Sequence, residues 1–487
     1  MNDKLRQLQP NALWEYFDSI TEIPRGSKKE ERIIAFMNDF GLNLGLETIV
    51  DDTGNVIIRK GATHGMENRK GIVLQSHLDM VLQKNSDVDF DFDSQGIITK
   101  IEGDWITADG TTLGADNGIG VAAIMAILAD PKIEHPALDA LFTIDEETGM
   151  TGAFGLKAGV LKGEILLNLD SEDEGELYIG CAGGINTTIN GSYKPIPLTE
   201  NNVAFELQIG GLKGGHSGMD INLERGNSNK LLSRLLLEWN LNTDLTLSSF
   251  DGGSLRNAIP REAKAVLVVT PDQKQKLKAF VDQWAKTIKE EFGNVEPDLF
   301  LKLTECDKPA DVVPNEFSIN LLRAIDASPN GVVSVSTKIE GLVELSTNLA
   351  RVSIANGDVN ILYLSRSSVE SKKMNLCRMI SSAFELVGGL NIIHDGSYPG
   401  WSPNPSSAIL KIMEKGYEDL FGSTPEVKAV HAGLECGLLG TNYPDMDMIS
   451  FGPTIRHPHS PDEKVHIPSV GKFWNYLLYT LKNAPTK

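Results

Sequence analysis

Apolar runs alternate with helical stretches over the first 170 or so residues. The runs are short and rich in Ile, Leu and Val, as buried strands are, and one longer apolar stretch has the length of a helix. Buried strands that alternate with helices are typical of an α/β layered domain. The predicted strands are 72–74, 138–144 and 165–169, and the predicted helix is 119–127.

The same α/β pattern returns near the C-terminus. Amphipathic stretches predict helices at 408–421 and 470–481, and apolar runs predict strands at 427–430 and 446–450. We therefore expect one α/β domain that is made from both ends of the chain, with a large insertion between them.

The insertion has a different order of elements. A stretch rich in Gly, Asn, Thr and Pro, 183–202, reads as a linker. After it, the order strand–helix–strand–strand–helix occurs twice, in units of roughly 95 residues. The first unit comprises 203–209, 227–239, a strand ending near 259, 263–269 and 274–292, and the second comprises 299–303, 316–325, 343–354, 359–364 and 371–386.

These patterns predict the domain organisation. The first part of the α/β domain is expected at 1–186 and the second part at 396–487. Between them, 187–395 is expected to form an α+β lid domain, and its pattern suggests a duplicated β-α-β-β-α unit.

Composition narrows the classes of function. The 487 residues include 66 Asp and Glu against 45 Lys and Arg, a net charge of −21, which disfavours nucleic acid and anionic membrane surfaces as partners. The four cysteines lie far apart and form no Cys-x-x-Cys pair, which favours a reducing compartment. The first ten residues lack the apolar segment of a signal peptide, and no run approaches ~20 apolar residues. We expect a cytoplasmic protein that binds neither nucleic acid nor membrane.

Candidate chemistry begins where the first predicted strand ends. His77 and Asp79 are two residues apart, so on a strand they point to the same side. Asp79 can then orient the imidazole while the other ring nitrogen binds a metal, although His-x-Asp also occurs by chance. Asp116 lies in a Gly-flanked turn before an apolar helix, where an N-cap is the alternative reading.

More acidic groups follow the next predicted strands. Asp145, Glu146 and Glu147 come directly after one strand, and Asp170 follows another. Crowded carboxylates at strand ends need a cation, or a raised pKa in at least one of them. His457 and His459 lie far downstream, in a Pro-rich loop.

Taken together, these motifs resemble the di-zinc peptidase family that includes aminoacylases, glutamate carboxypeptidases and non-specific dipeptidases. The resemblance extends nearly from end to end and is strongest to the branch that cleaves aminoacyl-histidine dipeptides. The motifs that carry it are 76–80, 114–118, 145–149, 168–172 and 459–463, with branch-level support from 214–218 and 431–437.

The resemblance implies two zinc ions, for which cobalt or manganese are possible substitutes. It implies Glu146 as the general base and Asp79 as the group that orients His77. It also implies a cis peptide bond after Asp116. The implied ligands are His77 and Asp170 for one ion, Glu147 and His459 for the other, and Asp116 as a bridge between them.

In the inserted domain, the resemblance implies that His216 stabilises the oxyanion of the reaction. Asn257 and Arg366 resemble contacts to the substrate, with Arg366 suited to grip a terminal carboxylate. His431 is a further candidate for substrate binding, whereas Glu435 receives no separate task. Structural or surface roles remain the alternative for each of these residues.

The expected function is metal-dependent hydrolysis of dipeptides of broad specificity, including Xaa-His dipeptides such as carnosine. The expected mechanism uses a water held between the two metals and a Glu base. The alternatives are an amidohydrolase that removes the acyl group of N-acyl amino acids, and a metal-binding or scaffolding protein that has kept the fold without activity. The expected partners are small dipeptide substrates and a second copy of the chain in a homodimer.

Overall fold

The computed structural model describes residues 4–198 and 201–487. They form two compact units, which we describe separately. The first unit comprises Met1–Gly180, Pro403–Ala429 and Leu434–Lys487, and the second comprises Cys181–Ser402 and Val430–Gly433. The domain boundaries expected from the sequence, 186/187 and 395/396, stay a prediction.

The first unit is built on an eight-stranded sheet with the order β1-β2-β6-β3-β7-β23-β8-β22. Its central strands β6, β3, β7 and β23 run parallel, so their carboxyl ends meet at one edge of the sheet. The strands are β1 (Glu47–Val50), β2 (Val56–Lys60), β3 (Ile72–His77), β6 (Leu138–Thr143), β7 (Ile165–Asn168), β8 (Glu176–Cys181), β22 (Glu426–Val430) and β23 (Asp447–Ser450).

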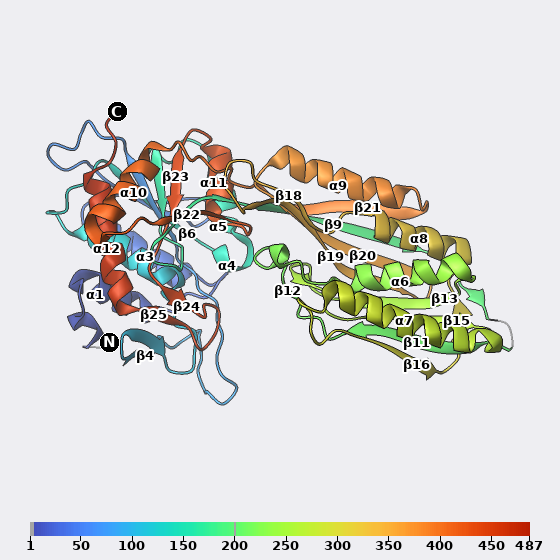
Figure 1. The fold of residues 1–487 in the computed structure, drawn as a ribbon. Coiled ribbons are helices and arrows are strands. Elements are labelled where there is room, and N and C mark those ends of the chain that lie inside the picture. The colour runs from blue at the N-terminus through green and yellow to red at the C-terminus, as the bar shows by residue number, and fades with distance from the viewer. Residues whose placement is uncertain (1–3, 199–200) are drawn as a thin grey trace. The chain divides into compact units, whose positions relative to one another are not determined.

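Helices cover this sheet (Figure 1). The most deeply buried is α3 (Ala115–Ala129), whose residues from Gly118 to Leu128 are all buried, as its unbroken apolar run predicts. The others are α1 (Asn11–Thr21), α2 (Glu31–Asn43), α4 (Glu146–Gly149), α5 (Thr151–Gly155), α10 (Ala408–Phe421), α11 (Glu435–Asn442) and α12 (Ile467–Lys482).

A small four-stranded sheet of the first unit joins two distant parts of the chain. Its order is β24-β25-β5-β4, and β25 (Lys464–His466) pairs with β5 (Trp105–Ala108). The remaining strands are β24 (Ile455–Arg456) and β4 (Thr99–Glu102). The loop between β24 and β25 carries His459, so this sheet positions a candidate ligand.

The second unit is a nine-stranded sheet with helices on one face (Figure 1). Its path is β16-β11-β15-β13-β19-β20-β9-β21, and β18 pairs with β19. The strands are β9 (Gly183–Ser192), β11 (Val203–Gly210), β13 (Leu247–Gly253), β15 (Ala263–Val269), β16 (Phe300–Cys306), β18 (Gly331–Val335), β19 (Val343–Ala355), β20 (Asp358–Ser367) and β21 (Leu390–Tyr398). The helices are α6 (Ser228–Asn242), α7 (Lys274–Phe292), α8 (Asn315–Ala327) and α9 (Glu370–Glu385).

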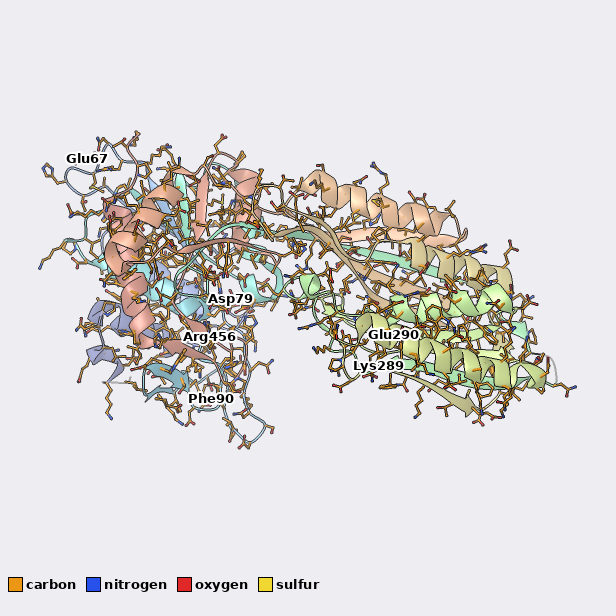
Figure 2. All side chains as sticks on the ribbon, in the orientation of Figure 1. Glu67, Asp79, Phe90, Lys289, Glu290 and Arg456 are labelled. Atoms are coloured by element: carbon orange, nitrogen blue, oxygen red, sulfur yellow. The ribbon has the colours of Figure 1, made fainter. Side chains whose placement is uncertain are left out.

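One apolar core joins these helices to the sheet. Each helix contributes a fully buried leucine, and the sheet contributes residues such as Phe250 and Tyr363. On α7 the pattern is amphipathic: Ile288 is buried, whereas Lys289 and Glu290 are exposed (Figure 2). The four leucines are Leu232, Leu277, Leu321 and Leu376. Two short pairs complete the unit: β10 (Ile196–Pro197) with β17 (Asp311–Val312), and β12 (Gly215–His216) with β14 (Ala258–Ile259).

The predicted linker 183–202 is wrong for most of its length. Its first ten residues form β9, which pairs with β20 on one side and with β21 on the other. Its glycines serve packing here, because a Cβ at Gly184 would lie 2.6 Å from the ring of Tyr398. Small and polar residues therefore fit an interior strand, although they look like a linker in sequence. Residues 199–200 of the expected linker lie outside the described residues.

The predicted duplicated unit is present as two halves of the sheet, but the prediction puts one strand in the wrong half. The order β16-β11-β15-β13 in one half matches β21-β9-β20-β19 in the other, and the halves meet at β13 and β19. The strand expected to open the second unit, 299–303, is β16, which pairs with β11 at the edge of the first half. Its place in the second half is taken by β9, which comes earlier in the chain.

Among the residues that the structure describes, no helix combines the length and the apolar character that crossing a membrane requires.

Candidate metal centre and active site

Strand ends bring the first group of candidate residues together. His77 is the last residue of β3, Glu146 and Glu147 open the short helix α4 after β6, and Asp170 follows β7. These three strands are parallel neighbours, so their side chains converge at the carboxyl edge of the sheet. Asp116 joins them from the start of α3, where its backbone is not helical and its side chain faces the site.

The distances define two positions that share one carboxylate. At the first position, Nε2 of His77 lies 3.2 Å from Oδ1 of Asp116 and 3.2 Å from Oδ1 of Asp170. At the second, Nε2 of His459 lies 2.9 Å from Oε2 of Glu147 and 3.3 Å from Oδ2 of Asp116. Asp116 therefore turns one oxygen toward each imidazole, and it does not act as a helix cap. The peptide bond that follows Asp116 is cis.

These donors suit divalent cations. Two ligand atoms on a tetrahedral zinc ion with bonds of 2.0–2.1 Å are about 3.3 Å apart, which matches the separations between the donor atoms here. Oε1 of Glu147 is buried and accepts no hydrogen bond, and Oδ1 of Asp170 is buried with Nε2 of His77 at 3.2 Å. Buried carboxylate oxygens without partners are costly, and a cation would satisfy them.

The electrostatics of the cluster also favour positive charge. Hydrogen bonds to Asp116 and Glu147 raise the pKa of His459 to about 11. Burial disfavours a charged His77, yet the carboxylates of Asp170 and Asp116 raise its pKa well above the usual value. Burial, opposed by His77, raises the pKa of Asp170 to about 7. The crowded carboxylates thus favour protonated neighbours. A divalent cation can supply the positive charge that these protons provide.

Asp79 is fully buried beside His77 and organises the residues around it. Its carboxylate accepts hydrogen bonds from the backbone N–H groups of Glu146 (3.0 Å) and Glu147 (3.2 Å) and from the hydroxyl of Ser27 (2.8 Å). Nδ1 of His77 lies 3.4 Å from it. Burial would raise the pKa of Asp79, but the hydrogen bond from His77 and the others lower it to about 2. Asp79 therefore lies beside the imidazole and forms hydrogen bonds to the turn that carries the two glutamates. Figure 2 marks its place in the first unit.

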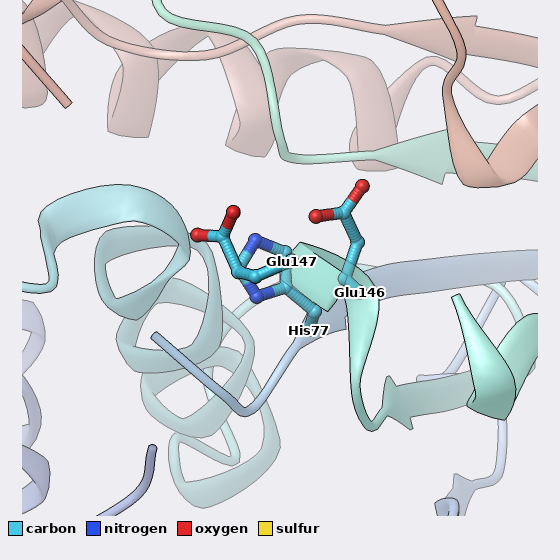
Figure 3. Close-up of side chains that lie close together, drawn as sticks. All are labelled: His77, Glu146 and Glu147. Carbon is cyan, nitrogen blue, oxygen red and sulfur yellow. The ribbon is translucent and has the colours of Figure 1, made fainter. Parts of the chain in front are cut away.

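The adjacent glutamates point in different directions. Figure 3 shows the carboxylates of Glu146 and Glu147 separated from each other, with the ring of His77 nearby. Donor atoms of these three residues nonetheless lie within 4.8 Å of one another. Burial raises the pKa of Glu146 well above its usual value, and the nearby carboxylates add to the effect. A raised pKa makes this carboxyl group a better proton acceptor than an ordinary glutamate.

Several buried groups of the site were not assigned a role from the sequence. Glu435, at the start of α11, accepts hydrogen bonds from Nε2 of Gln75 (2.6 Å) and from the hydroxyl of Thr143 (2.8 Å), and burial raises its pKa to about 8. Arg25 and Glu463 are also buried, and they form hydrogen bonds to backbone groups of the neighbouring loops. The local sequence around Arg25 gives no sign that this residue is buried near the site. Glu463 could have been found, because it belongs to the 459–463 motif.

The candidate residues of the second unit lie together. His216 on β12 pairs with Ala258 on β14, next to the exposed Asn257. Nδ1 of His216 accepts hydrogen bonds from the backbone N–H groups of Gly218 (3.2 Å) and Met219 (3.0 Å). A neutral imidazole that accepts at Nδ1 carries its proton at Nε2, so His216 presents a hydrogen-bond donor. Burial and the charge of Arg366 lower its pKa and favour this neutral form.

Arg366 and His431 surround the same turn. A Cβ at Gly218 would lie 2.4 Å from the carbonyl oxygen of His431 and 3.3 Å from Nε of Arg366. Arg366 donates to the hydroxyl of Tyr398 (2.8 Å), and its Nε is buried without a partner. Nε2 of His431 lies 2.7 Å from the hydroxyl of Ser346. Burial and the charge of Arg366 lower the pKa of His431 to about 3, so this ring is neutral.

Comparisons with known proteins agree with this geometry. The family described as peptidase dimerisation domain matches residues 207–296. The cytosol non-specific dipeptidase of Escherichia coli is 44% identical over 486 residues, which cover 99% of this chain and 100% of that protein. The crystal structure of aminoacylhistidine dipeptidase from Vibrio alginolyticus is 45% identical with a TM-score of 0.95, over 99% of this chain and 98% of that one. An aminopeptidase of Bacillus cereus shares the fold alone, at 16% identity and a TM-score of 0.57 over 98% of both chains.

The fold and the paired carboxylate–imidazole site are those of a metal-dependent peptide hydrolase. With 44% identity over its full length to one member, the chain belongs to the M20 family of metallopeptidases. The resemblance seen in the sequence is thereby confirmed. The roles of individual residues stay predictions.

Proposed function

We propose that this protein is a dipeptidase of broad specificity that includes Xaa-His dipeptides such as carnosine among its substrates. The proposal rests on the geometry of Asp116. Its two carboxylate oxygens face two different imidazoles at distances suited to a pair of cations. The names of the two relatives at 44% and 45% identity, both dipeptidases, support the substrate class.

The proposed cofactors are two zinc ions, with cobalt or manganese as possible substitutes. His77 and Asp170 would bind one ion, Glu147 and His459 the other, and Asp116 both. When bound, such a pair of ions would polarise the scissile carbonyl and lower the pKa of a water molecule.

The protein's own groups would move the proton. Glu146 takes a proton from the attacking water and delivers it to the nitrogen of the leaving amino acid. Its raised pKa suits both steps, because the carboxyl group can hold the proton and release it again. Asp79 keeps His77 oriented and holds the N–H groups of the turn that carries Glu146.

The second unit would supply contacts to the substrate. We assign to His216 the donor for the oxyanion, because its tautomer leaves Nε2–H free to donate. Arg366 would bind the terminal carboxylate of a dipeptide, since one of its N–H groups is buried without a partner. Asn257 and His431 are proposed as further contacts to the substrate.

A panel of substrates tests the proposed reaction. We expect kcat/KM for dipeptides, including carnosine, to exceed that for matched N-acyl amino acids at least ~10²-fold. The physical reason is that an N-acyl compound lacks the ammonium group, which an acidic site attracts. The measurement compares free and N-acetylated forms of the same dipeptide and the corresponding N-acetyl amino acid. Equal or faster release of acetate from the N-acyl amino acid would favour the alternative, a deacylase.

We also propose that the enzyme is a homodimer of the cytosol. The match of residues 207–296 to a dimerisation domain supports the dimer, and the name of the relative from Escherichia coli supports the compartment. Sedimentation velocity on the purified full-length chain tests the dimer.

His216→Ala is expected to lower kcat ~10²–10³-fold while KM changes much less. An oxyanion donor acts mainly in the transition state, so its loss affects turnover more than substrate binding. Steady-state kinetics on one dipeptide measures the two constants separately. His394→Ala is a matched control. His394 is another histidine of the second unit, on β21, and it forms hydrogen bonds with Thr187 and Ser381. A rise in KM with unchanged kcat would assign His216 to substrate binding instead.

A further inference from the structure

The carboxylate of Glu463 accepts four consecutive backbone N–H groups of another loop. Oε2 accepts from Leu113 (2.8 Å) and Gly114 (2.9 Å), and Oε1 accepts from Ala115 (2.8 Å) and Asp116 (3.2 Å). Glu463 is only 2% exposed, so little solvent competes for these bonds. The side chain therefore ties its own loop to the loop that carries Asp116.

Helix geometry explains why these N–H groups are available. Leu113 and Gly114 precede α3, and the backbone of Asp116 is not helical, so these N–H groups have no partner within the helix. Gly114 has a left-handed backbone (φ 69°), which lets consecutive N–H groups point to one side. A negative charge at this end of a helix is also favourable.

Arg25 completes the connection from the opposite side. It is 2% exposed, and it donates to the carbonyl oxygens of Leu78 (2.9 Å) and Asp79 (3.0 Å) and to that of Gly114. Arg25 and Glu463 thus carry opposite charges, are both buried, and both form hydrogen bonds to the backbones of the loops around the site.

The histidine of the second cation position depends on this arrangement more than that of the first. His459 comes four residues before Glu463, in the loop between two short strands, and its side chain is 51% exposed. Its backbone is left-handed (φ 59°), a conformation that a non-glycine residue keeps only when its surroundings hold it. His77, by contrast, ends a buried six-residue strand and is held by Asp79.

We propose that Glu463 is a positioning residue that sets the separation of His459 from Asp116 and thereby the affinity of the second cation position. This proposal rests on the two-cation site of the proposed function. Glu463 touches neither substrate nor cation; it acts through the backbone of the two loops that carry the ligands.

The substitution Glu463→Gln tests the proposal in the full-length protein. The amide turns an NH₂ group toward N–H donors, so at least one pair of the four hydrogen bonds is lost. We expect one cation to bind as in the wild type and the other to bind ~10–100-fold more weakly. Calorimetric titration of metal-free protein with Zn²⁺ measures both affinities, and the visible spectrum of Co²⁺ reports the geometry of each position.

Asp139→Asn is the matched control. Asp139 is also a buried carboxylate of the first unit that accepts a backbone N–H, from Gly163 at 3.0 Å, but it lies near the other end of β6. The substitution Asp139→Asn should leave the affinities of both cation positions unchanged. If Glu463→Gln fails to fold, Glu463→Asp keeps the charge on a shorter side chain and is expected to weaken the second cation selectively.

The outcomes separate this proposal from the function it rests on. If the wild-type protein binds fewer than two cations, the proposed two-cation site is contradicted, and so is the positioning role of Glu463. Two cations in the wild type with an unchanged second affinity in the folded Glu463 variant would overturn the positioning role alone. Equal weakening at both positions, matched by Asp139→Asn, would show a general loss of stability and would also overturn it.

Discussion

Glu146→Gln is expected to lower kcat for a dipeptide at least ~10²-fold while both cations stay bound. The amide keeps the size of the side chain but cannot take a proton from water. Glu147, and not Glu146, lies 2.9 Å from Nε2 of His459, so the loss of the Glu146 carboxylate should spare the cations. Steady-state kinetics and metal analysis of the same preparation measure both quantities.

The neighbouring substitution provides a matched contrast. Glu147→Gln should lose a cation first, because Oε2 of Glu147 lies 2.9 Å from Nε2 of His459 at the second position. If instead Glu146→Gln loses a cation and Glu147→Gln keeps both, the base and the ligand are interchanged between these two residues. Near-normal turnover in Glu146→Gln would remove the general-base assignment.

Removal of divalent cations is expected to abolish turnover, and about two ions per chain are expected in the active protein. Five ligand residues converge here, and a buried oxygen of Glu147 accepts no hydrogen bond, so bound cations would satisfy groups that the protein alone leaves unsatisfied. Activity should return when Zn²⁺, Co²⁺ or Mn²⁺ is added back. Elemental analysis together with activity before and after chelation makes the measurement.

The same experiment has a readout that does not depend on activity. A ligand present at ~1,000 times its Kd stabilises the folded state by about 4 kcal/mol, so the Tm should rise with added cation. Asp116→Ala should reduce this rise more than either His77→Ala or His459→Ala, because Asp116 serves both positions. Full turnover after rigorous removal of metal would refute the metal-dependent mechanism.

Periodic patterns of the sequence were sufficient for much of the secondary structure. The strand Ala263–Val269 and the helices Lys274–Phe292 and Ala408–Phe421 have the predicted bounds. In such segments the burial of one face repeats with the period of the element, so local sequence carries the signal. The strand β9 carried no such signal, because its glycines and polar residues fit only between β20 and β21.

The sequence alone predicts which carboxylates and histidines follow which strands, and that parallel strand ends bring them together. How those groups are held could be read only from contacts between distant segments. Arg25 and Glu463 bind backbone atoms of loops that are distant in sequence, and backbone atoms have no residue-specific signature that a pattern could reveal. The pairing of β16 with β11 is also a result of the tertiary structure. The residues of a strand indicate its period and its burial, but they do not indicate which neighbouring strand shares its hydrogen bonds.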